Sequence, residues 1–134
     1  MTNRKFYNPE KEQSELYTEK WITEKSRVKD INDLSVKHHY WEDSDGELWL
    51  DFNDPMENVR ADFDAYRQRL NYMSPQELKS LRKSLHLSQR AFASELGISY
   101  SVLSQIESNK RVQVKYQNNL FEWAKLKYEL NGQL

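Results

Sequence analysis

The chain of 134 residues is long enough for one compact domain or two small ones. It contains no cysteine, which excludes thiolate metal sites, thiol catalysis and disulfides, and no apolar run approaches the roughly 18–20 residues of a membrane span. The N-terminus is basic without the apolar stretch of a signal peptide, so we expect a soluble cytoplasmic protein with no membrane partner.

The formal net charge of −1 conceals a difference between the two halves of the chain. Residues 1–72 carry 11 basic and 16 acidic side chains, whereas residues 73–134 carry nine and five. This asymmetry is typical of an acidic module beside one that approaches a polyanion, although a swing of this size is also common between two solvated halves. Charge alone therefore leaves nucleic-acid binding open.

The first 35 residues predict a single helix between two polar segments. Residues 1–8 are expected to be frayed, and residues 30–35 form a polar break. Between them a weakly amphipathic helix is predicted from Glu10 to about Lys29, starting after Pro9. Three apolar side chains fall on one narrow face of that helix: Tyr17, Trp21 and Val28.

Two runs rich in aromatic and β-forming residues follow at 36–41 and 47–52. The segment 42–46 between them has turn chemistry, and its Gly46 is able to take a positive φ. The pattern predicts a β-hairpin that needs a helix to pack on. We expect three of its aromatic side chains to be exposed and to bind a partner protein: Tyr40, Trp41 and Trp49.

The rest of the chain predicts helices separated by short joints. Asp54 as N-cap and Pro55 at the first position indicate a helix that ends at about Tyr72. The sequence Ser74-Pro75-Gln76-Glu77 has the form of a capping box and places the module boundary at 71–74. Four further helices are predicted at about 75–85, 88–95, 99–108 and 113–130.

The segment 87–107 has the pattern of a helix-turn-helix unit. Ser88 is predicted to cap its first helix, Gly97 to end that helix in the left-handed conformation, and Ser99 to cap the second. The core positions leave a polar outer face on the second helix, which is able to lie against base edges in a major groove.

These residues resemble the lambda-repressor/Cro-like (XRE) helix-turn-helix family over about residues 75–130. The matching positions are Leu87-Ser88-Gln89, Ala93, Leu96-Gly97-Ile98-Ser99 and Leu103-Ser104-Gln105-Ile106-Glu107. Asn109 stands where the family usually has glycine, and asparagine tolerates a positive φ. The expected fold is mainly α, with a five-helix, lambda-repressor-like domain at 73–134. An acidic α+β module of helix, β-hairpin and linking helix precedes it at 1–72.

The resemblance implies a role for each motif position, although a solvated face is the structural alternative for each DNA candidate. Gln89 would contact a phosphate and buttress the second helix, and Arg82 would form an internal salt bridge with Glu107. The candidates for DNA contact are Ser88, Gln89, Arg90, Ser99, Tyr100, Ser101, Ser104, Gln105, Asn109, Lys110, Arg111 and Lys115.

The family usually binds two-fold operators, so a homodimer on a palindromic double-stranded site is expected. The order of modules also looks like that of MqsA-type antitoxins, which implies a repressor that binds a cognate toxin through residues 1–72. Those antitoxins hold zinc through cysteines, which this chain lacks. Two alternatives stay open: a phage or mobile-element regulator without a toxin, and a protein-binding inhibitor that uses the motif as a scaffold.

Other chemistry is weakly indicated. The segment 43–47 partly matches a calcium-loop pattern, but the alignment places Trp41 and Phe52 at positions where oxygen ligands are required. His38 and His39 are expected on opposite faces of a strand, as ordinary strand residues that cannot bind one metal together. We therefore expect no metal, no cofactor and no enzymatic activity.

Overall fold

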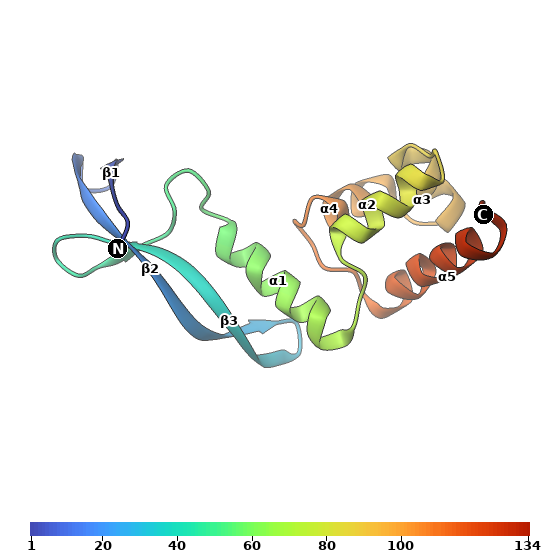
Figure 1. Cartoon of the computed structure of the whole chain (residues 1–134), viewed down its shortest axis with the longest axis horizontal. Helices are drawn as coiled ribbons and strands as arrows, with labels where there is room; N and C mark the ends of the chain where they lie inside the picture. Colours follow the sequence, from blue (N-terminus) through green and yellow to red (C-terminus); the bar gives the residue numbers. More distant parts are fainter. The chain divides into compact units, whose positions relative to one another are not determined.

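The computed structural model describes all residues from 1 to 134 and separates the chain into two compact units (Figure 1). The N-terminal unit is Met1–Tyr66 and the C-terminal unit is Arg67–Leu134. The strands are β1 (Asn3–Asn8), β2 (Gln13–Val28), β3 (Ile31–Glu42) and β4 (Leu48–Trp49). The helices are α1 (Glu57–Leu70), α2 (Pro75–Ser84), α3 (Gln89–Leu96), α4 (Tyr100–Glu107) and α5 (Lys115–Asn131).

The prediction of a mainly α fold is not confirmed, because four strands fill most of the first half of the chain. Residues 73–134 hold the four helices predicted from the sequence pattern, one fewer than the five-helix domain that the family resemblance implied. None of the helices is both long and apolar enough to span a lipid bilayer.

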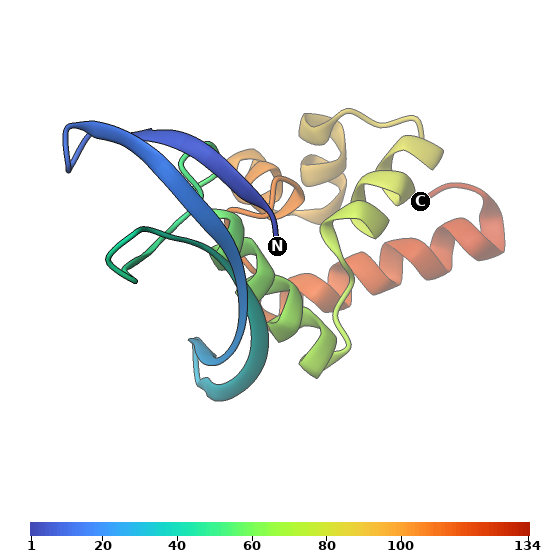
Figure 2. The ribbon, with the colours of Figure 1, turned by 60° about the vertical axis from the view of Figure 1, so that its left-hand side comes forward.

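The N-terminal unit is built on an antiparallel sheet in the order β1-β2-β3-β4. The long strand β2 pairs with β1 along its first part and with β3 along the rest, and Thr18 is the one residue paired on both sides. The sheet is therefore two hairpins that share one strand, and Figure 2 shows how strongly the β2–β3 ribbon curves.

The predicted helix at 10–29 and the predicted frayed segment at 1–8 are both wrong, because these residues form β2 and β1. The polar break at 30–35 is also wrong and belongs to β3. The sequence of β2 lacks the alternation of apolar and polar residues that marks a strand, because its inward side carries the polar residues Glu24 and Ser26. Both contact His38 of β3. Tyr, Thr, Trp and Ile in the segment favour a strand once such partners exist.

An aromatic cluster forms the core of the sheet. Phe6, Tyr17 and Trp41 are buried, and Trp49 and Phe52 pack against them. Phe6 lies 4.9 Å from Trp41 and 5.1 Å from Phe52 between ring centroids, mostly in tilted or edge-to-face arrangements. Burial of these rings supplies the apolar area that a small sheet needs to be stable.

The predicted hairpin turn at 42–46 is confirmed, and Asp43 organises it. Asp43 Oδ1 accepts the backbone N–H groups of Asp45 and Glu47, while Gly46 has a φ of 82°. Asp43 Oδ2 accepts the Trp49 indole N–H at 3.0 Å and the Lys11 ammonium at 2.8 Å. The Lys11 hydrogen bond lowers the pKa of Asp43, so the carboxylate is ionised. Its bond to Lys11 joins the β3–β4 turn to the β1–β2 turn.

Helix α1 begins at Glu57, three residues after the predicted cap at Asp54. The first turns of α1 lie along β3, where the Asn58 amide donates to the His39 carbonyl and accepts the His39 N–H. Strand β4 pairs only with Trp41 and Glu42, so His39 lies on a free edge of β3. The Asn58 side chain satisfies the backbone groups of His39 there, which prevents them from pairing with another strand.

The C-terminal unit is four helices around one apolar core. Leu78 and Leu81 of α2 meet Phe92 and Leu96 of α3, and α4 and α5 close the core. Figure 2 shows α5 running beside α2. The predicted capping box of α2 is confirmed by reciprocal hydrogen bonds between Ser74 and Glu77.

Four helices end on a residue with positive φ, followed by the backbone bonds of a Schellman motif. These residues are Asn71, His86, Gly97 and Asn109. Only one of them is glycine, and His86, which ends α2, holds the left-handed conformation at a φ of 57°.

Candidate nucleic-acid interface

The α3–turn–α4 segment has the geometry predicted for a helix-turn-helix. Ser88 Oγ accepts the Ala91 N–H at 3.1 Å and begins α3, while Gly97, at a φ of 75°, ends it. Ser99 Oγ then accepts the Val102 N–H and begins α4. Phe92, Ala93, Leu103 and Ile106 are buried beneath this unit, which sets the crossing of the two helices and fixes the outer face of α4.

A buried ionic cluster holds α2, α3 and α4 together. Arg82 Nε and Nη2 donate to the Glu107 carboxylate at 2.9–3.2 Å, as the sequence predicts. Gln89 Nε2 donates to the same carboxylate at 3.1 Å, and Glu107 is only 1% exposed. Because a buried carboxylate needs several donors, Gln89 fixes α3 against the end of α4. This contact agrees with the buttressing role that was predicted for Gln89.

The outer face of α4 is polar at its first turn. Tyr100 is 40% exposed, and the Arg90 guanidinium of α3 stacks 4.2 Å from the Tyr100 ring centroid. Ser99 and Ser101 share a hydrogen bond of 2.9 Å and are exposed. The stack holds one cation and one aromatic ring in fixed positions at the N-terminal end of α4.

The remaining candidates on α4 are less exposed. Ser104 and Gln105 are half-buried, and their carbonyls both accept the Ser108 hydroxyl.

The segment that follows α4 presents basic side chains from a fixed backbone. Asn109 has a φ of 59°, and the Lys110 N–H donates to the Gln105 carbonyl at 2.8 Å, which confirms the expected tolerance of asparagine at this turn. Lys110, Arg111 and, at the start of α5, Lys115 are exposed. Phosphate contacts require such cations at the rim of a recognition helix.

Arg67 anchors that basic segment, and the sequence alone did not indicate it. The Arg67 guanidinium is 2% exposed and donates to Gln113 Oε1 at 2.8 Å, to Asn109 Oδ1 at 2.6 Å and to the Arg111 carbonyl at 2.8 Å. Its three partners lie more than 40 residues further along the chain, so no local pattern marks this residue as structural.

The electrostatics of the region favour a polyanion. Between residues 79 and 115 there are seven Lys and Arg side chains against two glutamates, and one of the glutamates is neutralised by Arg82. The net positive charge lies on the same segment as the polar face of α4 and the cations that follow it, which is the arrangement that phosphate contacts require.

The three predicted partner-binding aromatics differ in exposure. Trp41 is 1% exposed and belongs to the aromatic core, so the expectation that it is exposed is wrong. Its position on β3 places it inward because Phe6 and Tyr17 pack there. Tyr40 is half-buried and donates its hydroxyl to Glu24, and burial together with this bond raises the pKa of Tyr40 to about 12. Trp49 is half-buried.

The two histidines are not ordinary strand residues, because each is buried between two carboxylates. His38 contacts Glu24 at 2.9 Å and Asp62 at 2.6 Å. His39 contacts Glu57 at 2.7 Å and Glu19 at 2.8 Å. Burial opposes the charged form, but the carboxylate hydrogen bonds outweigh it and raise the pKa of both histidines.

His39, Asp51 and Glu57 offer donor atoms within 4.8 Å of one another, which is close enough to be considered for a metal ion. Asp51 already accepts hydrogen bonds from the Trp41 indole and from two backbone N–H groups, and both nitrogens of His39 face carboxylates. The group is therefore satisfied as an ion-pair network that joins β2, β3 and α1.

Comparison with known proteins agrees with the geometry of the C-terminal unit. Residues 78–114 match the family model described as helix-turn-helix, a stretch well under half of the chain. No curated protein and no solved structure matches the chain. The matched stretch contains α3, α4, the ionic cluster of Arg82, Gln89 and Glu107, and two of the exposed cations, Lys110 and Arg111.

Proposed function

We propose that this chain, whose residues 78–114 form an XRE-type helix-turn-helix of a family of DNA-binding transcriptional regulators, is an autoregulating antitoxin. In this proposal residues 73–134 bind an operator and residues 1–72 bind a cognate toxin. The observation behind the DNA-binding part is a preformed polar face on α4 flanked by exposed cations of the Asn109–Lys115 segment.

The DNA-binding part assigns two kinds of contact. Tyr100, Ser101 and Ser104 face base edges, with Arg90 held over the Tyr100 ring. Lys110, Arg111 and Lys115 face phosphates, which fixes the register of the protein on the duplex but reads no sequence. Because serine side chains discriminate weakly, the shape of the operator contributes to its recognition.

A homodimer fits this function. Exposed apolar side chains run along one side of α5 at intervals of seven residues, with one more between them: Tyr116, Trp123, Leu126 and Leu130. This spacing is typical of a helix that packs against another helix. Two copies joined in this way would place two recognition helices roughly 34–36 Å apart on a palindromic site.

The toxin-binding part rests on the separate, acidic N-terminal unit. Within residues 1–66 there are nine basic and 16 acidic side chains, so this unit repels DNA and favours a partner protein of opposite charge. A regulator without a toxin is the second candidate, in which the same unit serves another purpose.

The deciding experiment is a mobility-shift titration on the region upstream of the gene, across a salt series, with and without the product of the neighbouring gene. Specific, salt-sensitive binding that the neighbour alters supports the antitoxin. Specific binding that is indifferent to the neighbour favours a plain regulator, and no specific binding refutes the DNA-binding role.

A matched pair of variants sharpens this test. Tyr100→Ala removes a proposed base contact and is expected to weaken operator binding by about 1–3 kcal/mol, with a smaller effect on random DNA. Trp123→Ala removes an aromatic ring of similar exposure from α5 and keeps α4 intact. It is expected to lower dimerisation, which sedimentation would measure separately. Equal losses on operator and random DNA for Tyr100→Ala would refute base readout by this residue.

A further inference from the structure

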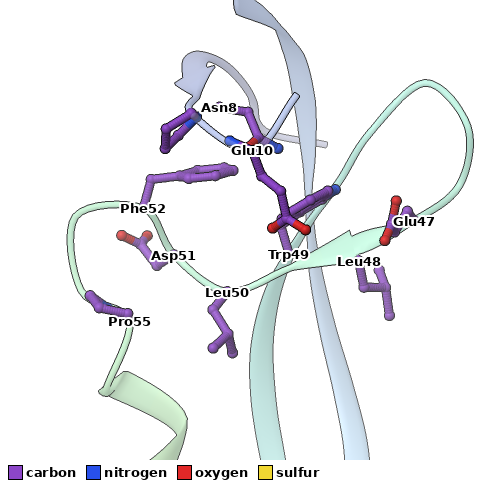
Figure 3. Close-up of a pocket in the computed structure, with 10 residues that line it drawn as sticks. Asn8, Glu10, Glu47, Leu48, Trp49, Leu50, Asp51, Phe52 and Pro55 are labelled. Atoms are coloured by element: carbon purple, nitrogen blue, oxygen red, sulfur yellow. The ribbon is translucent and has the colours of Figure 1, made fainter. Parts of the chain in front are cut away.

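We infer that the N-terminal unit contains a pocket for an arginine side chain of the partner protein. The inference rests on the proposed function, because that function supplies the partner. The pocket has a volume of about 460 Å³ and lies between the β1–β2 turn and the segment from Glu47 to Pro55 (Figure 3). Six of its ten lining residues are apolar, and its charged groups are all carboxylates.

Two aromatic rings form the walls, and both are held in place before any ligand arrives. Phe52 packs against Phe6 at 5.1 Å and against Tyr17 at 5.2 Å. The Trp49 indole N–H is already donated to Asp43 Oδ2 at 3.0 Å. Since this N–H is occupied, Trp49 offers a ligand its π face, and the face of tryptophan is the strongest aromatic partner for a cation.

The remaining wall suits an apolar stem. Leu48 and Leu50 line the pocket and are 39% and 48% exposed, which is unusual for leucines beside a packed aromatic core. Long cationic side chains bury an aliphatic stem against such surface while their charged end stays at the rim.

The rim is negative. Glu10 and Glu47 line the pocket, are exposed, and form no salt bridge. Figure 3 shows the Glu10 side chain reaching toward Trp49. No Lys or Arg lines the pocket. The third lining carboxylate, Asp51, accepts three hydrogen bonds from the chain itself, which leaves the two glutamates as acceptors for a ligand.

This combination selects arginine. A guanidinium is planar and weakly hydrated, so it stacks on an aromatic face and at the same time donates to carboxylates at its edge. A phosphate or an acidic peptide would meet uncompensated negative charge. A purely apolar side chain would offer the two carboxylates no donor. Preformed walls reduce the entropy that binding would otherwise cost.

The test uses the full-length chain and two short peptides that differ in one group. The first is acetyl-Gly-Leu-Arg-Leu-Gly-amide, and the second has citrulline in place of arginine, which keeps the shape and removes the charge. Binding is followed by the indole N–H resonance of Trp49, assigned with a Trp49→Phe variant. The arginine peptide is expected to bind at least about fivefold more tightly than the citrulline peptide and to weaken with salt.

A double variant and its control locate the charge that matters. Glu10→Gln with Glu47→Gln is expected to abolish the preference for arginine over citrulline while leaving the fold unchanged. Asp30→Asn changes charge at the other end of β2, in the β2–β3 turn, and is expected to keep the preference. Equal affinity for both peptides, or no shift of the Trp49 resonance with either, overturns the inference.

The neighbouring gene product separates the inference from the proposed function. If it binds the wild-type chain and the double variant equally well, the pocket is not the contact, although the antitoxin role stands. If it does not bind at all, the toxin partnership fails, and the two peptides still decide whether the pocket selects arginine. If it binds the wild-type chain and the double variant weakens that binding at least about fivefold, the inference is supported.

Discussion

Replacing Arg82 with methionine tests how the buried ionic cluster holds the helix-turn-helix together. The change keeps most of the side-chain volume but removes three donor contacts of 2.9–3.2 Å to the Glu107 carboxylate, which is 1% exposed. Gln89 alone would still donate to it, at 3.1 Å. A buried pair broken on one side costs about 3–5 kcal/mol. We expect a loss of about 3 kcal/mol in the free energy of unfolding, at the lower end because Gln89 remains.

A second variant makes this prediction refutable. Arg82→Met with Glu107→Leu removes both charges, so no carboxylate is left buried without its partner. The double variant is expected to be within about 1 kcal/mol of the wild type or more stable. Urea unfolding followed by circular dichroism at 222 nm would measure both, since most helical residues lie in the C-terminal unit. A single variant that costs under about 1 kcal/mol, or a double variant that is worse than the single, would show that the cluster does not depend on charge pairing.

Three further outcomes are expected. Arg111→Ala should weaken binding to all DNA sequences alike and lower the slope of log affinity against log salt by about one, whereas Lys125→Ala on α5 should leave the slope unchanged. Trp41→Ala should cost about 3–5 kcal/mol in stability of the N-terminal unit, measured by near-ultraviolet circular dichroism, because it empties a fully buried aromatic site. The folded pKa values of His38 and His39 lie above the ordinary value of 6.5, so their stabilising contribution is present below that pH and is lost as pH rises through the folded values. Thermal melts of the N-terminal unit should therefore show stability that falls as pH rises above about 6.5, and a slope that survives His38→Gln with His39→Gln would contradict this assignment.

The C-terminal unit was predictable because its signals are local. Ser74, Ser88 and Ser99 each cap a helix through a residue three positions away, and Gly97 and Asn109 end helices by their own backbone conformation. Such signals need no knowledge of distant contacts. Arg67 is the exception, since its partners are brought to it only by the tertiary fold.

The N-terminal unit was not predictable for the opposite reason. Glu24 and Ser26 are inward because His38 meets them from the next strand, and a polar side chain in that position hides the alternation that marks a strand. Trp41 was expected to be exposed, but it is 1% exposed in the structure. Here β1 supplies Phe6 as a cover, and the segment that forms β1 had been predicted to be frayed.

The sequence indicated which residues belong to the candidate site, but it did not indicate how those residues contact one another. The exposure of Arg90, Tyr100 and Lys110 agrees with a surface role, but the stacking of Arg90 on Tyr100 depends on the crossing of α3 and α4. The hydrogen bond from Gln89 to Glu107 likewise joins two helices, so spacing along one helix could not reveal it.

The shared strand β2 also bears on how quickly the N-terminal unit forms. Each of its two hairpins joins residues that are near neighbours in sequence, and such hairpins close within about 1–10 μs. The slow step is then the packing of Phe6 against Trp41 and Phe52, because this contact joins residues that are far apart in the sequence of the N-terminal unit. Because Thr18 is the one residue paired on both sides, the β1–β2 hairpin is able to open while the β2–β3 pairing persists. Amide exchange along β1 should accordingly be faster than along the middle of β3.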